Sequence, residues 1–134
     1  MTIVWSATSP TSGRFESSRE TEAPELFRRV DELRAAGSGY VEAGPASQEL
    51  PYLTLSFKDD QAVIERFNQD GSMSVLLGDG TTPEDADVYV PTMDDPDPAW
   101  FSGAFASTVE RGVTVLRRFL DGAASDDLGE WFDL

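Results

Sequence analysis

Apolar and polar positions near the start of the chain alternate with the period of a β-strand. In MTIVWSATSP, Ile3 and Trp5 fall on one face and Val4 falls on the other, which predicts a short strand with two different faces. The next segment, TSGRFESSRE, is polar and indicates a loop or the second arm of a hairpin.

The segment TEAPELFRRVDELRAAGSG has the pattern of an amphipathic helix. Pro24 suits the first turn, where its missing N–H costs nothing, and Gly37 or Gly39 suits the C-terminal stop. Apolar residues at helical spacing form one stripe, made of Leu26, Phe27, Val30 and Leu33.

The middle of the chain returns to alternation. In LPYLTLSFKDD, the residues Leu53, Leu55 and Phe57 alternate with a tyrosine, a threonine and a serine, which predicts a half-buried strand. The turns KDDQ and NQDG lead into AVIERF and SMSVLLGDG, so the three strands form an antiparallel meander. A further short strand is expected in ADVYVP, where Pro91 ends the strand or confines it to an edge.

The segment STVERGVTVLRRFLDG predicts a second helix. Ser107 as N-cap with Glu110 three residues later forms a capping box, and Gly122 suits the stop. Gly112 lies inside the helix at a cost of about 1 kcal/mol relative to alanine, so we expect it to permit close packing on the sheet. The apolar stripe consists of Val109, Val113, Leu116 and Leu120, with Phe119 beside it.

The C-terminal segment LGEWFDL is apolar, although terminal residues are usually polar and frayed. We therefore expect Trp131 to pack under the second helix and the residues after it to add an edge strand. Together the elements predict one α+β domain over residues 1–134. Its antiparallel meander sheet is packed by two main helices, and the C-terminal segment returns to the sheet.

The composition narrows the possible chemistry. The 134 residues include no histidine and no cysteine. This excludes disulfides, thiolate nucleophiles, serine–histidine triads, zinc hydrolase sites and histidine phosphotransfer. An enzyme would have to rely on carboxylates, tyrosine, lysine or arginine, so we expect no catalytic residues, no metal site and no cofactor.

The net charge is −15, from 25 acidic and 10 basic residues. Such a charge repels nucleic acid and anionic membranes and attracts basic partners, although solubility alone would also explain it. The first residues do not resemble a signal peptide, and no stretch has the roughly 18 apolar residues of a transmembrane helix. We therefore expect a cytoplasmic protein.

Acidic residues dominate the interval between Arg66 and Arg111, which contains no lysine or arginine. Its segment DDPDP lacks the order of a calcium-binding loop, and GDG at 78–80 reads as a turn. A solvated face and a partner-binding face remain as explanations, and the Trp100–Phe101 pair fits either the core or an interface. The candidate partner-binding residues are Asp79, Glu84, Asp85, Asp94, Asp95 and Asp97, with Trp100 as the apolar anchor.

The C-terminal run STVERGVTVLRRFLDGAASDDLGEWFDL resembles the end of the first-numbered family of bacterial polymorphic-toxin immunity proteins. That family typically ends with a helix carrying a Phe-Leu pair, a glycine-containing loop and a terminal tryptophan. The central meander is also similar to the family's strands. SDDLGEW stands where the family usually has a proline before the tryptophan. The matching residues here are Val113, Leu116, Phe119, Leu120, Gly122 and Trp131.

This resemblance implies a non-enzymatic antidote with an α+β fold. Such proteins bind a cognate toxin, commonly a nucleic-acid deaminase, and block it inside the producing cell. An acidic inhibitor would cover the toxin's basic substrate groove or active site, without binding nucleic acid or membrane itself. The alternative readings are an acidic adaptor or chaperone-like module for another basic client and a small enzyme with carboxylate chemistry.

Overall fold

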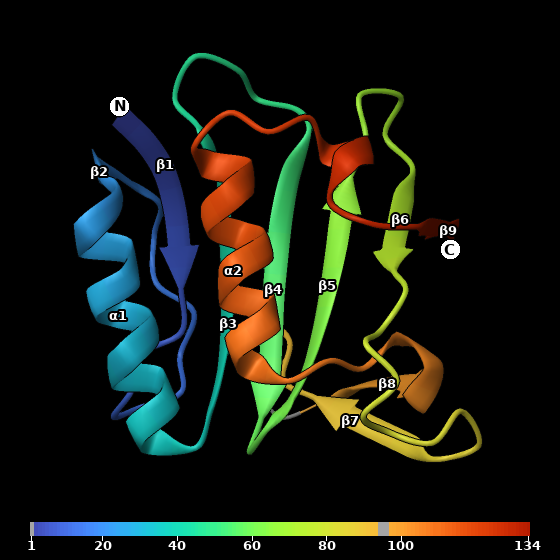
Figure 1. The fold of residues 1–134 in the computed structure, drawn as a ribbon. Helices are drawn as coiled ribbons and strands as arrows, with labels where there is room; N and C mark the ends of the chain where they lie inside the picture. The colour runs from blue at the N-terminus through green and yellow to red at the C-terminus, as the bar shows by residue number, and fades with distance from the viewer. Residues whose placement is uncertain (1, 94–96) are drawn as a thin grey trace.

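The computed structural model describes residues 2–93 and 97–134, and its strands form a large antiparallel sheet and a separate hairpin (Figure 1). In spatial order, the seven strands of the large sheet are β2 (Arg19–Glu22), β1 (Thr2–Ala7), β3 (Ser38–Pro45), β4 (Tyr52–Lys58), β5 (Gln61–Phe67), β6 (Met73–Leu76) and β9 (Trp131–Asp133). The hairpin pairs β7 (Asp87–Val90) with β8 (Ala99–Ser102). The predicted α+β meander is confirmed.

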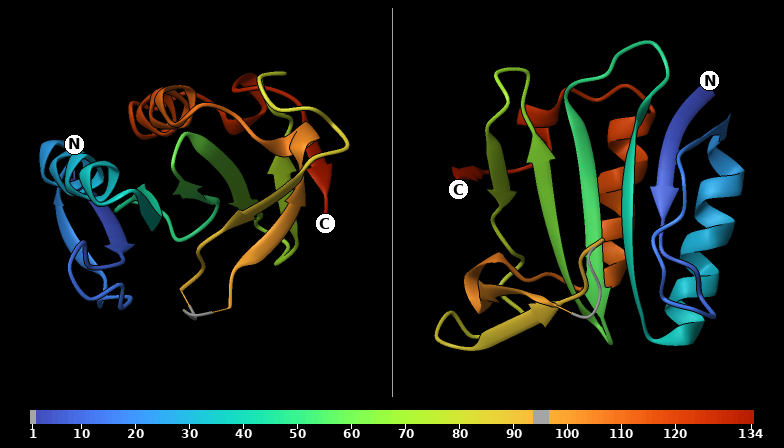
Figure 2. Two further views of the ribbon diagram at one scale, coloured as in Figure 1. Left: turned by 90° about the horizontal axis from the view of Figure 1, so that it is seen from below. Right: turned by 180° about the vertical axis from the view of Figure 1, so that it is seen from behind.

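Helices α1 (Ala23–Ala36) and α2 (Val109–Leu120) both cover the same face of the sheet (Figure 2). The β7–β8 hairpin lies against the opposite face, which we call the helix-free face. Two short 3-10 turns complete the structure, η1 (Gly103–Phe105) and η2 (Ser125–Asp127). Within the described part of the chain, no helix combines the length and the apolar character needed to span a bilayer.

Helix α1 forms where its sequence pattern predicts. The four residues of its apolar stripe are buried against the sheet. Gly37 ends the helix at a φ of 96°, a left-handed conformation that glycine adopts without a Cβ clash. The residue before the helix is Glu22, whose side chain makes no capping hydrogen bond.

Helix α2 begins one residue later than its capping box predicts. Thr108 is the N-cap, and its hydroxyl accepts a hydrogen bond from the N–H of Arg111. The predicted N-cap, Ser107, is instead extended and exchanges two backbone hydrogen bonds with Ala62 on β5, both of 2.8 Å. The Ser107–Glu110 capping box is therefore wrong, because pairing with β5 holds Ser107 outside the helix.

Gly112 lets α2 approach the sheet closely, as expected. A Cβ at this position would lie only 2.7 Å from Cδ1 of Leu55 on β4. The adjoining helix residues Leu116, Phe119 and Leu120 are buried in the same core, but Val113 is only partly buried.

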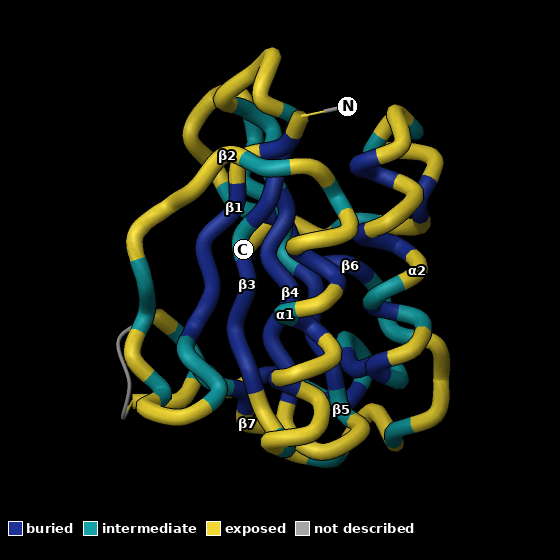
Figure 3. Tube along the Cα trace, turned by 90° about the vertical axis from the view of Figure 1, so that its left-hand side faces the viewer, coloured by how far each residue is buried: buried dark blue, intermediate teal, exposed yellow. Residues whose placement is uncertain are grey.

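Strand β4 differs from its prediction, because it is buried on both faces. Leu53, Leu55 and Phe57 pack beneath the helices, as expected. Thr54 and Ser56, predicted to meet solvent, are also buried (Figure 3). Part of the cover comes from the β7–β8 hairpin, which lies across the helix-free face near β4 and β5. The sequence did not reveal this second layer.

The C-terminal segment returns to the sheet as predicted. Strand β9 pairs antiparallel with β6 and forms one edge of the sheet. Trp131 is opposite Leu76 and half-buried on the helix side, where its indole N–H donates to the carbonyl of Ser125 at 2.8 Å. The guanidinium of Arg66 stacks 4.6 Å from the center of the indole ring.

We predict that Trp131→Ala lowers the free energy of unfolding by about 2–4 kcal/mol, because it removes a large side chain packed against the core. Phe132→Ala is the matched control, since Phe132 is on the opposite side of the same strand and is exposed. Urea denaturation of both variants provides the measurement. Equal midpoints for Trp131→Ala and the unaltered protein would show that the tail does not contribute to the core.

Candidate protein-binding surface

Within the acidic interval between Arg66 and Arg111, residues 77–86 form the loop before β7, and β7 and β8 form the hairpin that follows it. Of the predicted acidic residues, Asp79, Glu84, Asp85 and Asp97 are exposed there. Asp94 and Asp95 are outside the described residues. The structure thus brings part of the predicted set to the hairpin's surroundings.

Asp79 has a structural role at the start of α2. One carboxylate oxygen accepts the N–H of Thr108 at 3.0 Å, and the other accepts the N–H of Thr81 at 3.1 Å. Partial burial tends to raise the pKa of Asp79, but the hydrogen bonds from Thr81 and Thr108 and the charge of Arg111 outweigh it and lower the pKa. Its contact with a partner remains a prediction.

The β7–β8 hairpin has one buried face and one exposed face, because side chains alternate along each strand. Val88, Val90 and Phe101 face inward and pack against Val63 and Val75 of the large sheet. The sequence leaves the Trp100–Phe101 pair as either core or interface, and the structure separates the two residues. Phe101 is core, and Trp100 is exposed.

Two aromatic side chains lie side by side on the exposed face. Tyr89 and Trp100 are direct cross-strand partners and are 50% and 56% exposed. The indole N–H of Trp100 donates to a carboxylate oxygen of Asp87 at 3.0 Å, which holds the ring across the hairpin. Met93, just beyond β7, is also exposed. We call Asp87, Tyr89, Met93 and Trp100 the hairpin surface.

Trp100 is among the candidate binding residues predicted from the sequence, and Tyr89 is not. The signal was present in the alternation of DVYV and AWFS, which puts Tyr89 and Trp100 on one face once the two segments pair. The sequence does not predict the pairing, because AWFS follows an acidic, proline-containing stretch of the kind found in loops.

The strand register separates charges between the two faces of the large sheet. Glu42 is opposite Thr54, which in turn is opposite Glu65, so both glutamates project from the helix-free face. Arg19 and Arg66 occupy positions opposite Trp5 and Leu53, both of which face the helices. Among the strand residues that the structure describes, Lys58 is the only basic residue on the helix-free face, and it is at the end of β4.

Three arginines on the helix side are engaged in internal contacts. Arg29 forms an ion pair with Glu16 and donates to the carbonyl of Thr8. Arg111 donates to the carbonyl of Leu77 and the hydroxyl of Ser107, and Arg66 is paired with Asp126 at 2.9 Å. These contacts hold positive charge on the helix side, so the helix-free face has little basic charge to offset its carboxylates.

We predict that Asp79→Ala lowers the free energy of unfolding by about 1 kcal/mol at neutral pH, the usual cost of losing a capping side chain. The pKa of Asp79 in the folded protein is below its ordinary value of 3.8. The ionised carboxylate therefore stabilises the fold above that value, and this contribution is lost as the pH falls through the folded pKa.

Thermal denaturation of Asp79→Ala and the unaltered protein at pH 7 and at pH 3 tests this prediction, and the gap should narrow at the lower pH. Asp85→Ala is the control, because Asp85 is exposed in the neighbouring loop and should change stability little. A gap that is absent at pH 7 would show that the capping contacts contribute nothing.

The carboxylates of the helix-free face are not grouped like metal ligands. Over residues 2–93 and 97–134, no three acidic side chains converge in a way that could hold a metal ion. Tryptophan and tyrosine are enriched among the residues that bind other proteins, so the hairpin surface is the candidate binding surface. Comparison of the chain with protein-family models, curated proteins and solved structures gave no match.

Proposed function

We propose that this chain is an immunity protein, which binds a toxin domain in the cytoplasm and blocks a basic groove used for a nucleic-acid substrate. A deaminase is the toxin class that the sequence resemblance favours. The observation that supports the proposal most directly is the hairpin surface, where Tyr89 and Trp100 are exposed beside acidic residues. No reaction of its own belongs to this function.

The acidic charge would bring the two proteins together quickly. A toxin that grips nucleic acid needs a positive groove, and a partner of net charge −15 is attracted to it over a distance comparable with the Debye length. Glu84, Asp85 and Asp97 are exposed around the hairpin, where such charges chiefly raise the association rate.

The aromatic pair would hold the complex once formed. Tryptophan and tyrosine are enriched among the residues that dominate binding energy, because each buries a large rigid surface with little entropy loss. Trp100 is already held by its hydrogen bond to Asp87, so ordering this ring on binding costs less.

The rival function is an acidic adaptor or chaperone-like module, and toxin activity separates the two. The chain is co-expressed with the product of the adjacent upstream gene, and any purified complex is assayed for nucleic-acid deamination. An immunity protein abolishes the activity and protects the cells. A complex that retains full activity would support the adaptor instead.

We predict that Trp100→Ala accelerates dissociation from the toxin domain roughly 30-fold, which corresponds to about 2 kcal/mol for an interface anchor. Leu134→Ala is a matched control, because Leu134 is an exposed apolar residue that is not part of the hairpin surface. Surface plasmon resonance gives both rates. An unchanged dissociation rate for Trp100→Ala would place the anchor elsewhere.

We also predict that the combined variant Glu84→Gln, Asp85→Asn and Asp97→Asn slows association, with a smaller effect at high salt, because the added ions screen the same attraction. The matched control Glu25→Gln, Asp31→Asn and Glu110→Gln removes the same number of charges from the outer surfaces of the two helices. Both variants are measured at two salt concentrations. Equal slowing by the two would mean that net charge alone, and not its position, sets the rate.

A further inference from the structure

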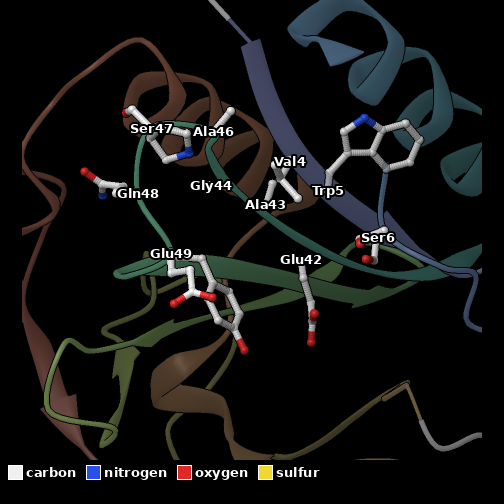
Figure 4. Close-up of a pocket in the computed structure, with 13 residues that line it drawn as sticks. Val4, Trp5, Ser6, Glu42, Ala43, Gly44, Ala46, Ser47, Gln48 and Glu49 are labelled. Carbon is white, nitrogen blue, oxygen red and sulfur yellow. The ribbon is translucent and has the colours of Figure 1, made fainter. Parts of the chain in front are cut away.

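A cavity of about 470 Å³ opens beside strands β1, β3 and β4, under the loop that joins β3 to β4 (Figure 4). Val4, Gly44, Pro45 and Ala46 contribute apolar surface to its lining. Its volume is within the range of pockets that receive small molecules or single side chains. Figure 4 shows Trp5 pointing toward α1 and away from the carboxylate groups of Glu42 and Glu49.

The charged side chains that line the cavity are both acidic. Glu42 and Glu49 both line it, and their side chains extend in the same general direction (Figure 4). The hydroxyl of Tyr40 donates to one oxygen of Glu42 at 2.8 Å, which orients the carboxylate. No lysine or arginine is among the lining residues, all of which lie in the described ranges.

Next to this lining, Thr54 has a hydroxyl without a partner. Thr54 is 0% exposed, and its oxygen has no hydrogen bond from any described residue. It is directly opposite Glu42 on the helix-free face and two residues from Tyr52, and both of these neighbours line the cavity. A buried polar atom without a hydrogen-bond partner is costly, and this one lies beside strand residues that line the cavity.

Glu65 is opposite Thr54 on the side away from Glu42, so the two glutamates flank the threonine on the helix-free face. Burial raises the pKa of Glu65, and no charged partner offsets that effect. Burial, together with the charges of Glu42 and Glu65, raises the pKa of Tyr52 to about 12. The tyrosine therefore stays neutral, and none of the described residues that line the cavity carries a positive charge.

We propose that the cavity binds an arginine side chain of the partner protein. The apolar lining suits the methylene stem, and the carboxylates of Glu42 and Glu49 can accept the N–H groups of the planar guanidinium. Arginine fits better than a metal ion, since the described acidic groups are not arranged as metal ligands. This inference rests on the proposed function and adds a second contact at the far end of the helix-free face from the hairpin surface.

A probe without the toxin tests the chemistry of the cavity first. Arginine amide is titrated into the full chain and followed by amide NMR shifts, with citrulline amide as the neutral control of similar shape. We expect saturable shifts at Glu42, Gly44 and Glu49 with arginine amide only. Glu42→Gln should weaken the binding at least fivefold, and Glu25→Gln on α1 should not change it. The assignment would be overturned if citrulline amide caused the same shifts as arginine amide. It would also be overturned if arginine amide bound the Glu42→Gln variant as tightly as the unaltered chain.

The second arm uses the toxin domain. Glu42→Gln should weaken its binding at least fivefold, and Ala46→Arg should do the same by placing a guanidinium at the cavity from an exposed loop residue. Thermal denaturation confirms that both variants fold. Toxin affinity unchanged by both variants would overturn the assignment to a partner's arginine, even if the free probe binds. A toxin domain that binds no form of the chain would instead refute the proposed function, and the probe titration would still decide the chemistry of the cavity.

Discussion

The start of helix α2 is the junction that attaches this helix to the large sheet. Ser107 pairs with Ala62 on β5, while carboxylates from two separate loops, Asp60 and Asp79, accept the N–H groups of Val109 and Thr108. The carboxylates accept hydrogen bonds from N–H groups at the helix start, which have no acceptor within the helix. They also place negative charge at the positive end of the helix dipole. The segment that follows the β7–β8 hairpin is thereby attached to the large sheet.

Much of the fold follows from local patterns. Both helices, the meander of β4 to β6 and the C-terminal strand carry clear periodicity, so they could be predicted. Strand β3 could not, because SGYVEAGP contains two glycines and a proline and has little alternation. It becomes a strand through pairing with β1 and β4, a tertiary effect that overrides local propensity.

The candidate surface shows the same limit. Charge and aromatic content predict an acidic interval with Trp100 as its apolar anchor, but the role of each acid depends on contacts distant in sequence. Asp79 caps a helix 29 residues away, and Asp87 holds Trp100 across a strand pair. The cavity beside Glu42 had no sequence signal, because it arises where the β3–β4 loop folds over the face of the sheet. Composition predicts the sign of the charge on a surface, and the strand register decides which side chains lie together on that surface.

Side chains alternate along the hairpin between inward positions, which packing constrains, and outward positions, which it does not. Val88, Val90 and Phe101 are constrained by packing, whereas Tyr89 and Trp100 have few contacts to lose. Substitutions at the outward positions can therefore accumulate without loss of the fold, and the pairing of β7 with β8 keeps each new side chain at a defined place. A lineage that meets a changing set of partners could diversify its recognition within these few codons while the rest of the gene stays under purifying constraint.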